Sequence, residues 1–153
     1  MRYINIAAEA ALAMLFTAMV TVGAMQVFNR FFLNVSLSWS EEFQKFAFIW
    51  LVFIAIPVAY NRGAHLCVDV IVNMLPSPVR RGFVIATDLL WLGLGVAFVL
   101  LTWKLMGVAR YQQSAGLGIS MAWVYAGMAV GGAYLALTAT VRLIKFAGRE
   151  VAQ

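Results

Sequence analysis

The chain has 153 residues, of which 64% are hydrophobic and only 11% are charged, and its formal net charge is +5. Soluble domains contain roughly a quarter charged residues, and so short a chain could not bury this much apolar surface in water, so we expect a membrane protein. The basic residues lie at the ends of apolar runs, which argues against nucleic-acid binding. One cysteine and one histidine exclude an internal disulfide and bis-histidine haem ligation within the chain.

The first predicted transmembrane helix covers residues 4–28, where Glu9 is the one charged residue. A spanning helix needs about 20 mostly apolar residues. This stretch is also longer than the apolar core of a signal peptide, so we expect a retained helix. A short polar connection follows, with Arg30 and then residues 34–38.

The second predicted helix covers residues 39–60. The sequence Ser38-Trp39-Ser40-Glu41 at its start matches a capping box, in which the serine hydroxyl and the glutamate bind free backbone N–H groups. Pro57 is expected to kink this helix or to loosen its last turn.

Charged residues gather at the start of this second helix. Glu41 and Glu42 favour the positive end of the helix dipole, and Glu41 can pair with Lys45 four residues later. With Arg30 nearby, the same residues could instead form a docking patch for a partner on the outer side. The sequence leaves both interpretations open.

Residues 64–75 lie between the second and third predicted helices. His65, Asp69 and Asn73 recur every four positions, with apolar residues on the other faces. This spacing predicts a short amphipathic helix in the membrane interface or against a partner. His65 and Asp69 could form a pair for proton handling or metal binding. No third ligand is near in sequence, so we favour a structural or interface role.

The third predicted helix covers residues 78–110, after Ser77-Pro78, a capping serine and a proline at the first helical position. Its length of roughly 45 Å, at 1.5 Å per residue, predicts a tilt or a protruding end. Gly93 and Gly95 are candidates for close packing against another helix.

The fourth predicted helix covers residues 121–146 and has Ser120 as its cap. Gly127 and Gly131 have the G-x-x-x-G spacing that lets two membrane helices approach closely. Neither a repeat nor a linker interrupts the sequence, so we expect a single membrane domain over residues 1–153: a bundle of four transmembrane helices with one short interfacial helix.

Two carboxylates, Glu9 and Asp88, lie one or two turns inside the first and third predicted helices. A carboxylate has a shorter reach than lysine, so both are expected to face protein or water. A proton- or cation-coupled site is one interpretation. We favour structural ion pairs.

The distribution of Lys and Arg predicts that both termini lie in the cytoplasm. The side with the termini and the connection between the second and third helices carries Arg2, Arg62, Arg80, Arg81, Arg142, Lys145 and Arg149. The other side carries Arg30, Lys45, Lys104 and Arg110. Trp39, Trp103, Tyr111 and Trp123 then fall at the outer interface, which amphipathic rings prefer.

The sequence lacks a phosphate-binding loop, a nucleophile elbow, a cysteine pair and a duplicated or broken helix pair of the kind that builds a transport site. We therefore expect neither an enzyme nor a cofactor or metal site. A chain with four spans and no pathway of its own is expected to support a larger protein.

The stretch from Arg30 to Pro76 resembles the small, DctQ-like membrane subunit of the tripartite ATP-independent periplasmic (TRAP) transporters. The residues that carry the resemblance are Arg30, Leu37-Ser38-Trp39-Ser40-Glu41-Glu42, the run from Phe46 to Phe53, Arg62-Gly63-Ala64-His65-Leu66-Cys67-Val68-Asp69, and Leu75-Pro76. The rest of the chain is similar in topology and size. The segment Ala55-Ile56-Pro57 departs from the family, in which a smaller, glycine-containing stretch is expected.

The resemblance implies a multi-pass protein of the bacterial inner membrane. In that family a periplasmic binding protein delivers an organic acid to a large elevator-type subunit that couples uptake to sodium. This chain would be the scaffold beside it. The candidate structural or interface residues are Arg30, Trp39, Glu41, Glu42, His65 and Asp69. The outer segments 30–42 and 110–119 would meet the binding protein.

The alternative function is a self-sufficient, homodimeric, proton-coupled carrier that uses Glu9 or Asp88. The substrate stays open, and a sialic acid, a dicarboxylate and a sulfonate are all compatible with the sequence.

Overall fold

The structure, a computed structural model, describes residues 2–35, 37–62 and 76–150. These residues form α1 (Arg2–Phe28), a π-helical turn η1 (Asn29–Leu33), α2 (Ser38–Asn61), α4 (Ser77–Ala109) and α5 (Met121–Glu150). Each of the four long helices is long and apolar enough to cross a membrane. The four predicted spans are therefore confirmed, with α5 four residues longer than expected. The predicted interfacial helix at residues 64–75, with His65 and Asp69, lies outside the described residues.

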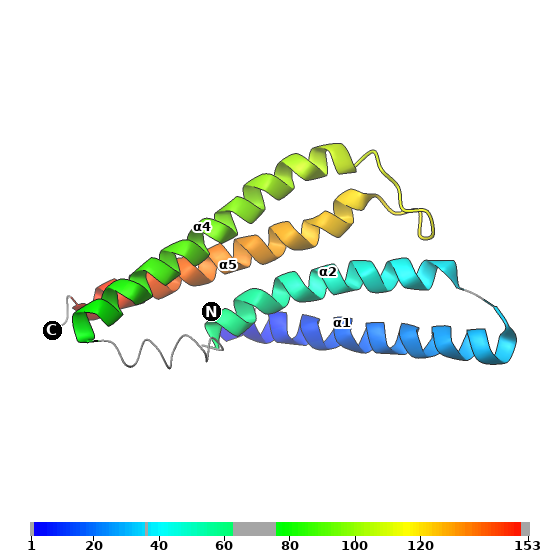
Figure 1. The fold of residues 1–153 in the computed structure, drawn as a ribbon, viewed down its shortest axis with the longest axis horizontal. Helices are drawn as coiled ribbons and strands as arrows, with labels where there is room; N and C mark the ends of the chain where they lie inside the picture. Colours follow the sequence, from blue (N-terminus) through cyan, green and yellow to red (C-terminus); the bar gives the residue numbers. More distant parts are fainter. Residues whose placement is uncertain (1, 36, 63–75, 151–153) are drawn as a thin grey trace.

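The four helices lie in an open row in the order α1, α2, α5 and α4 (Figure 1). α5 packs on α4 and on α2, and α1 packs on the outer side of α2, whereas the backbones of α1 and α4 are not in contact within the described helices. Lipid is as apolar as a protein interior, so spanning helices need not close around a core. The predicted bundle thus takes the form of a row with two edges.

The two ends of this row differ. Both chain termini, the end of α2 and the start of α4 lie toward one end, called here the terminal end (Figure 1). The connection from α1 to α2 and the connection from α4 to α5 lie at the opposite end, called here the loop end. α4 and α5 extend beyond the other two helices at the terminal end.

Glycines on one face of α5 allow α2 to approach closely. A Cβ on Gly131 would lie 2.3 Å from the carbonyl oxygen of Phe53, and one on Gly127 would lie 2.9 Å from the ring of Trp50. No real Cβ tolerates such distances, so these positions require glycine at the present helix separation.

On its other side α5 packs against α4, and this contact depends on a second pair of glycines. A Cβ on Gly95 would lie 2.7 Å from the backbone nitrogen of Ala136, and one on Gly132 would lie 2.9 Å from the carbonyl oxygen of Gly95. A Cβ on Gly93, by contrast, would meet nothing within 4 Å. Of the two α4 glycines singled out by sequence, only Gly95 lies in a tight contact.

The packed core lies where α2, α4 and α5 meet. Tyr60, Leu135 and Ala139 are buried there, and Ile56, Trp91 and Leu92 pack against them. Aromatic side chains join α2 to α4: Phe53 meets Phe98 edge to face with ring centroids 5.2 Å apart. Tyr60 meets Trp91 with centroids 5.3 Å apart.

The first residues of α2 and α4 differ from two of the predictions. α2 begins at Ser38 with Leu37 as its N-cap and has no side-chain cap hydrogen bond, so the predicted capping box is wrong. Instead, the buried Ser40 hydroxyl donates to the Leu37 carbonyl oxygen over 2.7 Å. α4 begins one residue earlier than predicted, with Pro76 as its N-cap.

The cap of α5 is as predicted. The backbone N–H of Ala122 donates to the Ser120 hydroxyl over 3.3 Å. Pro57 lies buried inside α2, which continues past it to Asn61.

Candidate functional site

A buried ion pair joins three helices near the terminal end. Asp88 on α4 is only 3% exposed, and its carboxylate accepts a hydrogen bond from the Tyr60 hydroxyl of α2. Nε of Arg142, on α5, lies 3.6 Å from the same carboxylate oxygen. Arg142 Nη1 donates to the Tyr60 carbonyl oxygen over 3.0 Å, and its guanidinium lies 4.5 Å from the centroid of the Tyr60 ring. These three residues are called here the buried cluster.

The buried cluster explains how a carboxylate is tolerated inside a transmembrane helix. An isolated charge there is costly, whereas a charge paired with a cation and a hydrogen-bond donor is compensated. Sequence reasoning missed Arg142 as the partner of Asp88. The sequence held one usable signal for this pair, the position of each residue along its helix. Asp88 and Arg142 both lie about 30 Å from the loop end of their helices, at 1.5 Å per residue.

A second polar group joins α1 to its neighbours at the same end. Glu9 pairs with Arg62 at 2.6 Å, with both side chains partly exposed. Asn61 Nδ2 donates to Asn5 Oδ1 over 2.9 Å, and the Tyr134 hydroxyl of α5 donates to the same oxygen over 2.7 Å. The carboxylates of Glu9 and Asp88 are thus both in ion pairs.

Glu42 ties the start of α2 to the connection between α4 and α5. Its Oε2 accepts hydrogen bonds from the backbone N–H groups of Gly116, over 2.9 Å, and Leu117, over 3.0 Å. A Cβ on Gly116 would lie 3.0 Å from this oxygen, so glycine permits the approach. Gly118, at φ +65°, adopts the left-handed conformation that closes the turn. This contact is called here the loop clamp.

Replacing Glu42 with glutamine is expected to loosen the loop clamp. Hydrogen bonds to a charged acceptor are stronger than those to a neutral one, so glutamine should hold the two backbone N–H groups less firmly. Hydrogen exchange at the Gly116 and Leu117 amides should therefore accelerate several-fold. Glu41→Gln is the matched control. Equal exchange rates in both variants would contradict the clamp.

The other predicted residues at the loop end lie outside this contact. Arg30 in η1 and Glu41 in the first turn of α2 are exposed, and Trp39 is half-buried. Glu41 and Lys45 form no ion pair within 4.0 Å among the residues that the structure describes, so that predicted pair is not formed. Glu42, which was predicted to act together with Glu41, contacts the connection between α4 and α5 by itself.

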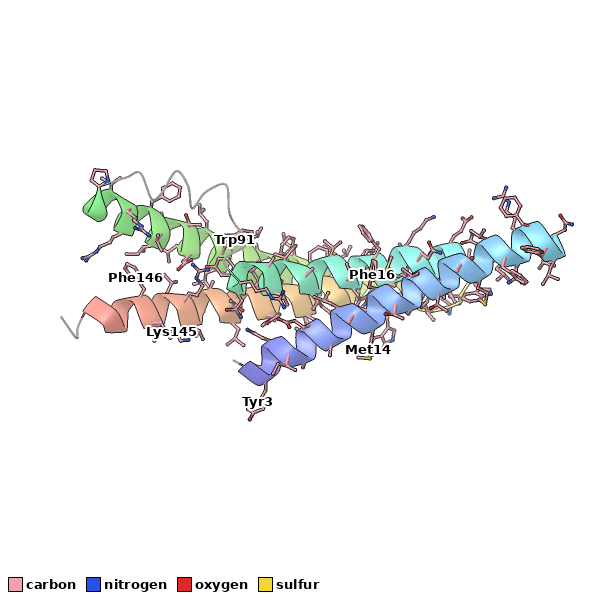
Figure 2. The ribbon with its side chains drawn as sticks, turned by 90° about the horizontal axis from the view of Figure 1, so that it is seen from below. Tyr3, Met14, Phe16, Trp91, Lys145 and Phe146 are labelled. Atoms are coloured by element: carbon pink, nitrogen blue, oxygen red, sulfur yellow. The ribbon has the colours of Figure 1, made fainter. Side chains whose placement is uncertain are left out.

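The surface of the row is largely apolar. None of the apolar window of α1 is buried, and Met14 and Phe16 are 68% and 62% exposed. Figure 2 shows Tyr3 and Met14 pointing away from the other helices. A surface of this kind is covered by lipid or by a partner protein. Over residues 2–35, 37–62 and 76–150, no group of three His, Cys, Asp or Glu residues could hold a metal ion.

Comparison with known proteins supplies a family. Residues 19–149 match the sequence model described as "Tripartite ATP-independent periplasmic transporters, DctQ component". The chain is 25% identical over 121 residues to the sialic acid TRAP transporter small permease protein SiaQ of Vibrio cholerae, covering 79% of this chain and 70% of that protein.

Two longer relatives are matched over only a small part of their length. The sialic acid TRAP transporter permease protein SiaT of Haemophilus influenzae is 28% identical over 130 residues, which are 85% of this chain and 21% of SiaT. The isethionate TRAP transporter permease protein DctMQ of Oleidesulfovibrio alaskensis is 30% identical over 74 residues, which are 48% of this chain and 11% of DctMQ.

Proposed function

This chain belongs to the DctQ component family of tripartite ATP-independent periplasmic transporters, and we propose that it acts as a scaffold that braces a large elevator-type subunit. That subunit would carry out sodium-coupled uptake of an organic acid delivered by a periplasmic binding protein. The observation that carries the proposal is the buried cluster, because the carboxylate of Asp88 joins three helices. A carboxylate that is already engaged by a cation and a hydroxyl supports a structural role over a solute-binding site.

A large partner is supported by the relatives and by the surface of the row. The chain matches a short part of the longer permease proteins SiaT and DctMQ, which indicates that chains of this kind accompany further permease sequence. The open row leaves apolar side chains exposed on α1 and α4, where a partner subunit could pack. The names of the relatives include sialic acid and isethionate, so the substrate is proposed only as an organic acid.

The proposed location is the bacterial inner membrane, with both termini in the cytoplasm. The excess of Lys and Arg at the terminal end supports this orientation. The loop end then faces the periplasm, where the clamped connection and Arg30 are available to the binding protein. His65 and Asp69 are proposed to belong to an interfacial helix on the cytoplasmic side.

The test is co-purification followed by transport. The affinity-tagged chain is expected to retain a much larger membrane protein. Proteoliposomes that contain both proteins, supplied with the binding protein, should accumulate solute under a sodium gradient. Proteoliposomes with this chain alone should show no flux above that of empty vesicles. Flux through this chain alone, abolished by Glu9→Gln or Asp88→Asn, would instead establish the self-sufficient carrier.

A further inference from the structure

A cavity of about 210 Å³ lies between α4 and α5 at the terminal end. Val84 and Asp88 line it from α4, and Arg142, Lys145 and Phe146 line it from α5. Figure 2 shows Phe146 between the two helices. Val84 and Phe146 each lie about 6 Å nearer the terminal end than the ion pair, at 1.5 Å per residue. The cavity therefore extends from Asp88 and Arg142 toward that end.

The ion pair at the inner end of this cavity has unused hydrogen-bonding capacity. Nε of Arg142 lies 3.6 Å from Asp88 Oδ1, which is too long for a direct hydrogen bond. Asp88 Oδ2 and Arg142 Nη2 take part in no hydrogen bond within the described ranges. The Asp88 side chain is only 4% exposed, so a carboxylate oxygen without a donor is costly there. Polar atoms in this situation are usually satisfied by ordered water.

The charges in the cavity select a neutral occupant. An anion would meet the Asp88 carboxylate, and a cation would meet the Arg142 guanidinium. Lys145 lies nearer the terminal end and is exposed, so its charge does not require a partner in the cavity. The occupant must donate a hydrogen bond to Asp88 Oδ2 and accept one from Arg142 Nη2. Water does both, and at about 30 Å³ for each molecule several fit the cavity.

The depth of the cavity allows water to enter it. Asp88 lies about 30 Å from the loop end of α4, at 1.5 Å per residue, and the hydrocarbon core of a bilayer is about 30 Å thick. With the loop end at one interface, Asp88 lies close to the opposite interface, and the cavity continues outward from it. Ionisable side chains inside a membrane commonly face a water-filled cavity of this kind.

We propose that this cavity is a hydration site that connects the buried cluster to the aqueous phase at the terminal end. Ordered water donates to Asp88 Oδ2 and accepts from Arg142 Nη2, and further water follows the cavity past Val84 and Phe146. A side-chain amide of a partner protein has the same donor and acceptor, but one amide group would leave most of the 210 Å³ unfilled. Hydration is independent of the bracing role, since flux through the chain alone would overturn the bracing and leave the water in place.

The test measures contact between water and Asp88 by solid-state NMR of the full-length chain in phospholipid bilayers. The sequence contains two aspartates, Asp69 and Asp88, so isotope-labelled aspartate gives two side-chain carboxyl signals, and Asp88→Asn identifies the one from Asp88. Magnetisation transferred from water at short mixing times should reach the Asp88 carboxyl carbon. Val84→Phe places an apolar ring in the cavity and should reduce this transfer several-fold. Val96→Phe, the same change at an exposed position of α4, is the matched control and should leave the transfer unchanged.

A variant that fails to fold cannot imitate the expected result, because an unfolded chain would expose Asp88 to water and raise the transfer. Two results would overturn the proposal. The first is the absence of transfer from water to Asp88 in the unaltered chain, or equal transfer in the Val84 and Val96 variants. The second is loss of the water signal when the chain is purified together with the large subunit, which would assign the cavity to a polar side chain of that partner.

Discussion

Replacing Asp88 with alanine is expected to lower the free energy of unfolding by about 3 kcal/mol, because removing one partner of a buried ion pair leaves the other uncompensated. Arg142 would keep its charge between α4 and α5, and the Tyr60 hydroxyl would lose its acceptor. The expected value is at the low end for buried pairs because the Arg142 side chain is 37% exposed and water can reach it. Reversible unfolding in mixed micelles of increasing SDS content measures the loss.

Two further variants separate this effect from a general loss of charge. Glu9→Gln breaks the pair with Arg62, whose side chains are 40% and 64% exposed, and should cost less than about 1 kcal/mol. Replacing both Asp88 and Arg142 with leucine should recover most of the stability, since apolar replacement of a whole buried pair is often neutral. If the Asp88 and Glu9 variants lost equal stability, the buried cluster would not be a determinant of the fold.

The second large effect is expected at Gly131, where alanine should cost about 3 kcal/mol, the upper end of the usual range for overpacking. The new Cβ would lie 2.3 Å from the Phe53 carbonyl oxygen and 2.7 Å from its carbonyl carbon. Backbone atoms cannot rotate away as a side chain can, so α2 and α5 must separate. The free energy of unfolding measures the loss of stability. The distance between spin labels on α2 and α5, measured by double electron–electron resonance, reports the separation of the helices.

Gly93→Ala is the matched control for this prediction. It adds the same methyl group to a spanning helix, but nothing lies within 4 Å of the new Cβ. Alanine is about 1 kcal/mol more favourable than glycine inside a helix, so this variant should be slightly more stable. Substitutions of the same chemistry are thus expected to have opposite signs. A similar loss in both variants would show that the α2–α5 contact is not tight.

The spans could be predicted from sequence because their signal is local. About 20 apolar residues identify a spanning helix whatever it packs against, and the four predicted ranges agree with α1, α2, α4 and α5 within a few residues. The open row could not be predicted. In a bilayer, an apolar side chain such as Met14 or Leu135 is tolerated both against lipid and in the core, so apolar periodicity does not reveal which face of a helix packs.

The polar contacts were missed because they join residues far apart in the chain. Glu42 meets backbone groups 74 and 75 positions later, and nothing in the local sequence separates it from Glu41. The capping box was wrong for the opposite reason. A local pattern fits Ser38 and Glu41, but α2 already begins at Ser38 with Leu37 as its N-cap, and the Leu37 carbonyl oxygen accepts the Ser40 hydroxyl.

The buried cluster also constrains the order in which the protein can mature. Tyr60 and Arg142 are 82 residues apart, and Arg142 belongs to the last of the four spans. During synthesis, α4 therefore enters the bilayer with Asp88 still lacking its cation, and the helices can lock together only once α5 has been inserted. A chain truncated before Arg142 would therefore keep an unpaired acid in α4 and would lack the cation that joins the three helices.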